Sequence, residues 1–231
     1  MDDWKSVLVE FAALEVEFGA ELSEQFAVTE LDTGPMLDIA AQGLESLALP
    51  IPSIFYSLHD GPFERCLVCK TELLTAPVEY EIVRLFRLEE PVTEYALCVG
   101  CCDPLWDGFS GETRDRLADE FRRRVDWETR RMRMISAMNF LAADIEPWIA
   151  ECLFTGKPRQ ECHIYQVVAT CIGPHLLPWD RPYMRSGESL RDTRSMWSKG
   201  SRGRYDDFVE EFLGPTPSLA KETPWPLALT M

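Results

Sequence analysis

The first part of the chain alternates apolar and acidic positions with the spacing of an amphipathic helix. Large apolar residues recur at steps of three or four along residues 3–28, namely Trp4, Leu8, Phe11, Leu14, Phe18 and Leu22. This period predicts a helix with one buried face, and the same stripe would also suit a partner-binding helix. A turn at 32–35 interrupts the pattern, and a second short helix is expected over 36–48. The pattern therefore predicts an acidic helical N-terminal region over residues 1–60.

Between two pairs of cysteines the apolar residues recur at every second position, as in a strand. Residues 78–82 alternate apolar and charged side chains, and residues 93–98 are the expected returning strand after a proline-containing turn. Ser110 then makes a credible cap for a helix over about 111–125, and a further helical run covers 127–149. The middle of the chain therefore predicts a β-hairpin followed by helices.

The last third returns to strand character and ends in a helix. Residues 164–169 are rich in β-branched and aromatic side chains, as a strand requires. Residues 186–204 are rich in Ser, Gly and Arg, which indicates a loop or a short helix. A last helix is expected over 205–213, stopped by a Gly-Pro pair, and the proline-rich tail behind it should be extended.

Composition and charge limit the classes of function. The chain has 231 residues, is 46% hydrophobic and contains seven Trp, so a real packed core is expected. Its net charge of −16 argues against a protein that coats nucleic acid or an anionic membrane. Residues 1–60 carry twelve acids and one base, whereas eight bases lie in Arg114–Arg133 and seven in Arg181–Arg204. These basic stretches are read as solvated faces, although one of them could contact the acidic region or an anionic partner.

Eight cysteines are more readily explained by metal binding than by disulfides. The chain starts with acids where a signal peptide needs bases, and no apolar run reaches membrane-spanning length, so a reducing, cytoplasmic setting is expected. Cys66 and Cys69 form one Cys-x-x-Cys pair, and Cys98 and Cys101 form another. Four thiolates in two such knuckles can close a tetrahedral cage around a structural zinc ion, although iron also suits this cage. Cys102 competes with Cys101 for the last position.

A second cysteine region resembles the first. Cys152-Leu153 parallels Cys66-Leu67, and Cys171-Ile172-Gly173 parallels Cys98-Val99-Gly100. Both of these Cys-x-Gly segments are followed by a Trp and then by Ser-Gly-Glu. Thr155 and Pro174 then stand where Cys69 and Cys101 would be. We therefore expect residues 152–200 to be a degenerate copy of 66–125. This copy could contain a second metal site made of Cys152, Cys171 and His175, with Cys162 or His163. Alternatively, these residues are buried side chains with a structural role and bind no metal.

Catalytic signatures are missing from the sequence. No phosphate-binding glycine loop occurs, and Gly108-Phe109-Ser110-Gly111 lacks the spacing of a nucleophile elbow. His59 has no identifiable partner, and a cage of four cysteines leaves no open coordination position for a hydrolytic water.

The cysteine pairs, with the hairpin between them and the helix after them, resemble zinc-ribbon and treble-clef modules over about residues 64–125. Together with the phrases at 182–187 and 206–215, they resemble a family of uncharacterised bacterial proteins over about residues 60–218. This resemblance implies a bacterial cytoplasmic protein and no particular activity.

The predicted fold class is α+β, with an acidic helical region (1–60), a zinc-binding module with following helices (61–150) and a C-terminal module with a Pro-rich tail (151–231). The predicted function is that of a non-catalytic, zinc-stabilised interaction or adaptor protein whose partner is another protein, with no membrane association. A nucleic-acid-binding module using Arg114–Arg133 or Arg181–Arg204 is the alternative. A metal- or thiol-dependent enzyme, with Cys102 as a reactive thiol, is a further alternative.

Overall fold

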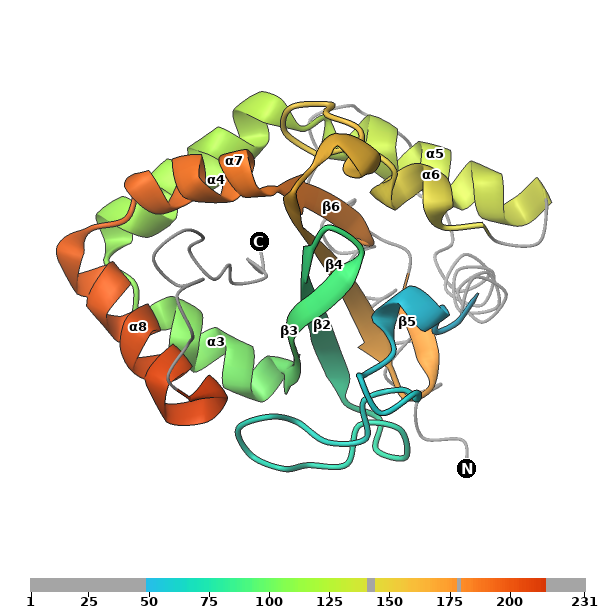
Figure 1. The fold of residues 1–231 in the computed structure, drawn as a ribbon, viewed down its shortest axis with the longest axis horizontal. Helices are drawn as coiled ribbons and strands as arrows, with labels where there is room; N and C mark the ends of the chain where they lie inside the picture. Colours follow the sequence, from blue (N-terminus) through green and yellow to red (C-terminus); the bar gives the residue numbers. More distant parts are fainter. Residues whose placement is uncertain (1–48, 141–143, 178–179, 215–231) are drawn as a thin grey trace, which may run out of the picture.

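The computed structural model describes residues 49–140, 144–177 and 180–214. The helices expected over 3–28 and 36–48, and the proline-rich tail, lie outside these residues. Within the described residues the chain forms a six-stranded antiparallel sheet and six α-helices (Figure 1), which confirms the α+β class. No described helix is both long enough and apolar enough to cross a membrane.

The sheet is built around two long central strands. In chain order the strands are β1 (Leu49–Pro50), β2 (Glu79–Arg87), β3 (Glu90–Cys98), β4 (Ile164–Ile172), β5 (His175–Leu177) and β6 (Tyr183–Ser186). Strands β2 and β4 pair along nine residues, β3 flanks β2, and β5 and β6 each pair with one end of β4. All nine residues of β4 are buried, because neighbouring strands and covering layers enclose it on every side.

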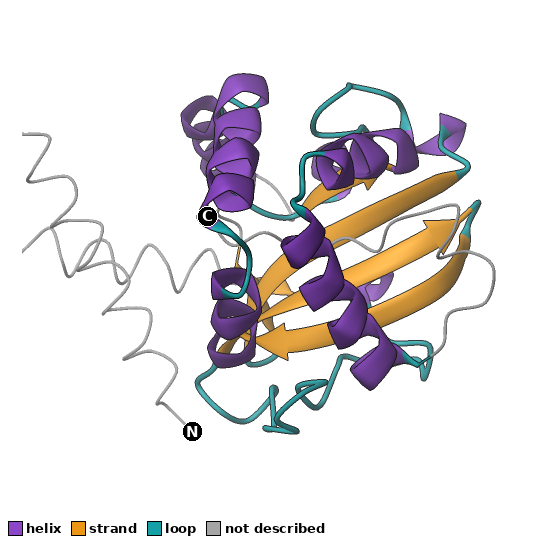
Figure 2. Cartoon of the chain, turned by 90° about the vertical axis from the view of Figure 1, so that its left-hand side faces the viewer, coloured by secondary structure: helices purple, strands orange, loops and turns teal. Residues whose placement is uncertain are grey.

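Helices lie over one face of this sheet (Figure 2). The helices are α3 (Val99–Asp107), α4 (Gly111–Arg124), α5 (Trp127–Phe140), α6 (Glu146–Ile149), α7 (Gly187–Ser195) and α8 (Lys199–Leu213), with short 3-10 turns at Ser53–Phe55 and Arg159–Glu161. Helices α3, α4, α7 and α8 form the covering layer, and α5 and α6 lie near β6 (Figure 1). The helix predicted over 111–125 is confirmed as α4, and Ser110 caps it by accepting the Thr113 N–H at 3.3 Å.

Several sequence-based boundaries need correction. The run predicted as one helix over 127–149 contains two helices, α5 and α6. The segment 186–204, predicted as a loop or short helix, forms α7 and the start of α8. Helix α3 was not predicted, because cysteines, a glycine and an internal proline are poor helix formers. These helices follow from tertiary packing against the sheet rather than from local propensity.

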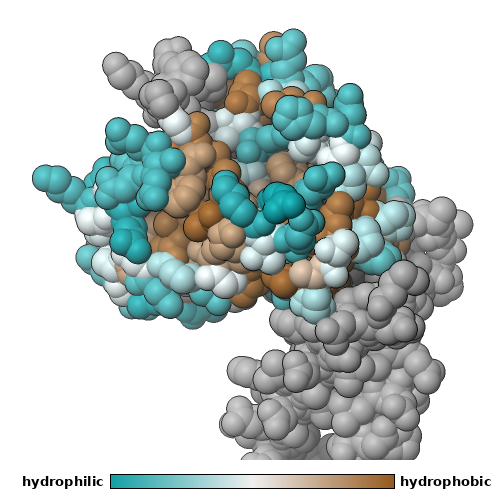
Figure 3. All heavy atoms as spheres, turned by 90° about the horizontal axis from the view of Figure 1, so that it is seen from below, coloured by the Kyte–Doolittle hydropathy of each residue, from teal (hydrophilic) through white to brown (hydrophobic). Residues whose placement is uncertain are grey.

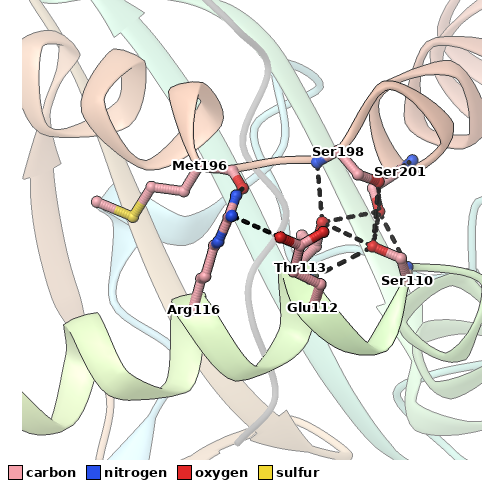
Figure 4. A network of polar contacts seen from close by, with 7 residues as sticks. All are labelled: Ser110, Glu112, Thr113, Arg116, Met196, Ser198 and Ser201. Atoms are coloured by element: carbon pink, nitrogen blue, oxygen red, sulfur yellow. Dashed lines mark hydrogen bonds and ion pairs between the residues drawn. The ribbon is translucent and has the colours of Figure 1, made fainter.

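The chain follows the same path twice. Ser110 and Ser198 are the N-caps of α4 and α8, and each helix follows a nine-residue helix, α3 or α7. The two caps exchange hydrogen bonds reciprocally (Figure 4): the Ser110 N–H donates to Ser201 Oγ at 3.0 Å, and the Ser198 N–H donates to Thr113 Oγ1 at 2.9 Å. Equivalent atoms of the two helix pairs therefore face each other across an approximate two-fold axis.

The same approximate axis passes through the sheet. Val83 of β2 pairs with Val168 of β4, and these residues pair on their outer sides with Tyr95 of β3 and Tyr183 of β6. Two halves that begin near residues 66 and 152 thus share one continuous sheet. The division of the chain at residue 150 remains a sequence-based prediction.

Candidate metal centre

Four cysteines from three elements meet at one end of the β2–β3 hairpin. Cys66 and Cys69 lie in the turn before β2, Cys98 is the last residue of β3, and Cys101 lies in the first turn of α3. Their sulfur atoms all lie within 4.8 Å of one another, and Cys69 Sγ is 3.5 Å from Cys98 Sγ. A tetrahedral ion with metal–sulfur bonds of about 2.3 Å separates its sulfurs by about 3.8 Å. The four positions therefore fit one metal ion.

Backbone hydrogen bonds shape the first pair into a knuckle. The Cys66 N–H donates to Thr71 O at 2.9 Å, and the Lys70 N–H donates to Cys66 O at 3.1 Å. Lys70 has a φ of 62°, the left-handed conformation that lets the chain turn back on itself. The Leu67 N–H donates to Ala96 O at 2.8 Å, which attaches the knuckle to β3. The knuckle is thus held beside the second cysteine pair by main-chain contacts.

The thiols differ in how readily they lose a proton. Hydrogen bonds from Thr71 lower the pKa of Cys69 to about 6. Burial raises the pKa of Cys98 to about 11 and also raises the pKa of Cys101. Binding of a metal ion requires thiolates, so it would displace protons from the two thiols of the second pair.

Cys102 does not belong to this cluster. It is 6% exposed, and its thiol donates a hydrogen bond to Leu97 O at 3.7 Å. Burial raises the pKa of Cys102, so the thiol stays protonated. The competition between neighbouring cysteines is therefore resolved in favour of Cys101.

The second half contains a knuckle with the same main-chain bonds. The Cys152 N–H donates to Lys157 O at 2.8 Å, and the Leu153 N–H donates to Met184 O at 2.8 Å, as Leu67 does to β3. The Ser186 N–H donates to Cys152 Sγ at 3.3 Å, and in the first half the equivalent bond runs from the Cys98 N–H to Cys66 Sγ at 3.5 Å. These matching bonds define which positions correspond.

The four ligand positions of the first half correspond to Cys152, Thr155, Ser186 and Ser189 in the second half. The sequence-based alignment was right for the first two positions and wrong for the last two, where it placed Cys171 and Pro174. Burial raises the pKa of Cys152, but hydrogen bonds from Ser186 and Thr155 help to outweigh this effect and the pKa falls to about 7. Hydroxyl groups thus replace three of the four sulfurs.

The structure does not assemble the proposed second metal site. Cys152 contacts Ser186 next to Tyr165, whereas Cys171 lies six residues further along β4, roughly 20 Å away at the rise of a strand. Across the described ranges, Cys66, Cys69, Cys98 and Cys101 are the single group of three or more metal-ligating residues close enough to share an ion. Burial in the middle of the sheet, and not metal ligation, explains Cys171.

The basic stretches form many contacts within the fold. Ion pairs join Arg114 to Asp107, Arg116 to Glu112, Arg122 to Asp119, Arg123 and Arg124 to Glu120, Arg131 to Asp180, Arg181 to Glu81, and Arg194 to Asp206. Arg185 is fully buried, and its guanidinium donates to Ser189 Oγ at 3.1 Å and stacks 4.5 Å from the Phe154 ring centre. Exposed pairs add little stability, but each carboxylate cancels the charge of its arginine at the surface.

Comparison with known proteins identifies no relative of this chain. The chain matches no protein-family model, no curated protein and no solved structure, so the resemblance to a bacterial family rests on the quoted motifs alone.

Proposed function

We propose that this chain is a non-catalytic interaction or adaptor protein, stabilised by a structural zinc ion, whose partner is another protein. The observation that carries the proposal is the set of four sulfurs within 4.8 Å of one another. Four protein ligands complete the coordination that zinc prefers and leave no position for a substrate or a water. Cys66, Cys69, Cys98 and Cys101 would hold the ion, which would supply folding energy rather than chemistry.

The arrangement supports a treble-clef-like reading of the first half. A knuckle, a hairpin and a helix that starts at the last pair of ligands follow one another in that order. The second half repeats this path with hydroxyl-bearing side chains in the ligand positions, which supports its reading as a degenerate copy. On this proposal, the copy keeps the shape of the knuckle through hydrogen bonds and no longer requires an ion.

The nucleic-acid alternative is best placed on an open groove between α4 and α5. This groove, of about 590 Å³, is lined by two tryptophans, Trp106 and Trp127, and by Arg114, Arg122 and Arg131 among others. Aromatic faces and arginines can bind single strands. Each of these arginines pairs with an aspartate, however, which weighs against a polyanionic ligand. Salt-sensitive binding of a single-stranded oligonucleotide that Arg122→Glu abolishes would favour this alternative.

The enzyme alternative depends on a reactive Cys102 or on a second metal site, and the geometry favours neither. Cys102 is buried and protonated, unlike reactive thiols, and the second cysteine cluster is not assembled. His59 is exposed in a turn, and its N–H donates to Ser57 Oγ at 3.1 Å. Thiol labelling of the zinc-loaded protein should therefore be unchanged by Cys102→Ser.

The proposed function is tested with the full chain, purified with zinc, as bait for cross-linked capture followed by a binding measurement on the captured partner. We expect a protein partner with a defined affinity. If no partner is captured and a metal-dependent activity is found, the proposal fails.

A further inference from the structure

A hollow adjoins the metal centre on the face that carries the first knuckle and the ends of α3 and α8. It encloses about 230 Å³. Its apolar wall consists of Val68 from the knuckle, Pro104 and Leu105 from α3, and Phe208 and Phe212 from α8. Figure 3 looks at this side of the molecule and shows hydrophobic residues in a hollow surrounded by hydrophilic ones. The space suits one large apolar anchor side chain, the kind of group that dominates binding energy at interfaces.

The rim of this hollow is acidic. Asp207 and Glu211 line it from consecutive turns of α8, and both are exposed. Arg204 also lines the hollow, but its side chain lies over Gly108 at the end of α3, where carbonyl groups attract a cation. Cys101 forms part of the wall, and a divalent ion held by four thiolates carries a net charge of about −2. Two carboxylates thus line the hollow against one guanidinium, and a loaded metal centre would add negative charge beside them.

We infer that this hollow binds a basic amphipathic segment of a partner protein, with one apolar side chain in the hollow and Lys or Arg residues against Asp207 and Glu211. The inference rests on the proposed function and names the chemistry of its partner. The net charge of −16 favours the same partner class, because it speeds the approach of a basic chain.

The metal ion and the hollow are coupled through shared residues. Val68 lies between Cys66 and Cys69, and Cys101 is both a ligand position and a wall of the hollow. Loss of the ion would remove the link between the knuckle and Cys101 of α3, and the main-chain bond to β3 alone would then hold this wall of the hollow. Binding of the segment should therefore require the metal-loaded protein.

The test uses the full zinc-loaded chain and a fluorescein-labelled helical peptide of leucine and lysine, about five turns long, followed by fluorescence anisotropy. We expect Glu211→Lys to weaken binding about tenfold, because it reverses a charge at the rim. Glu210→Lys is the matched control, since it makes the same change one residue away, on an exposed position that does not line the hollow. It should change the affinity less than about twofold.

Further measurements distinguish binding in the hollow from general charge attraction, and distinguish failure of this inference from failure of the proposed function. A leucine–glutamate peptide of the same spacing should not bind, and metal-stripped protein should lose the affinity for the lysine peptide. Equal effects of Glu211→Lys and Glu210→Lys, or equal binding of the two peptides, would overturn the inference. A partner captured equally by the wild-type chain and by Glu211→Lys would also overturn it, while leaving the proposed function intact.

Discussion

Cys66 and Cys152 occupy equivalent positions in the two knuckles, so the same substitution separates metal binding from local packing. In each knuckle the cysteine N–H donates to a carbonyl five residues later, and the sulfur accepts a backbone N–H from the end of a strand. Cys66→Ser removes one of four metal ligands. Cys152→Ser replaces a sulfur that has only hydrogen-bond partners, chiefly Ser186 and Thr155.

The two substitutions should differ strongly in magnitude. An ion at a thousand times its dissociation constant stabilises the folded state by about 4 kcal/mol, and Cys66→Ser should remove nearly all of this. Cys152→Ser keeps an acceptor for the Ser186 N–H and should cost about 1 kcal/mol, with or without the ion. Urea unfolding in the presence of zinc and of a chelator measures both free energies, and native mass spectrometry counts the bound ions.

The contrast between the two variants is the critical result. We expect one ion per chain in the wild type and in Cys152→Ser, and none in Cys66→Ser. If Cys66→Ser kept both the ion and its stability, or if Cys152→Ser lost the ion, the assignment of ligands to the first knuckle would be refuted.

Three further predictions concern the fold and the site. Ser110→Ala and Ser198→Ala should each lower the free energy of unfolding by about 1 kcal/mol. A double-mutant cycle should give a coupling of about 0.5 kcal/mol or more, because the two hydroxyls are hydrogen-bonded to each other at 3.1 Å; additive effects would contradict this. Glu81→Gln should destabilise the protein by about 3 kcal/mol at pH 8 in urea unfolding, since it leaves the buried charge of Arg181, 2.9 Å away, without its carboxylate; a neutral effect would contradict the pair. Zinc affinity should fall as the pH falls, because protons compete with the ion for the sulfurs and burial raises the pKa of Cys98 to about 11. A zinc affinity that does not change between pH 6 and pH 8 would argue against thiolate ligation.

The sequence predicts the cluster of four cysteines well, because the signal for it lies in short stretches of the chain. Two residues between cysteines define each knuckle, and alternation between the pairs defines the hairpin that brings them together. The choice between Cys101 and Cys102 also follows from local geometry, since the first turn of α3 directs the two side chains to different sides.

The register of the second half could not be found in the same way. Ser-Gly-Glu occurs at 110–112 and at 186–188, but the first copy caps α4 and the second caps α7, which is the counterpart of α3. The useful signal was weaker: Tyr95 precedes Cys98 by three residues, as Tyr183 precedes Ser186. Pairing of both tyrosines with the central valines of the sheet reveals this correspondence, and only the tertiary structure supplies that pairing.

The position of the basic residues was visible in the sequence, but the identity of their partners was not. Arg131 pairs with Asp180 across 49 positions, and Arg181 pairs with Glu81 across about twice as many. Such contacts depend on the sheet and helices being assembled, so charge counts alone overstate how basic the surface is.

The central claim is that Cys66, Cys69, Cys98 and Cys101 close a cage around one zinc ion. X-ray absorption at the zinc edge of the full-length protein tests it most directly. The account predicts four sulfur neighbours at about 2.3 Å and no nitrogen or oxygen in the first coordination sphere. A fit that requires fewer sulfurs together with a water or a histidine nitrogen would contradict the closed cage and, with it, the non-catalytic function proposed for the protein.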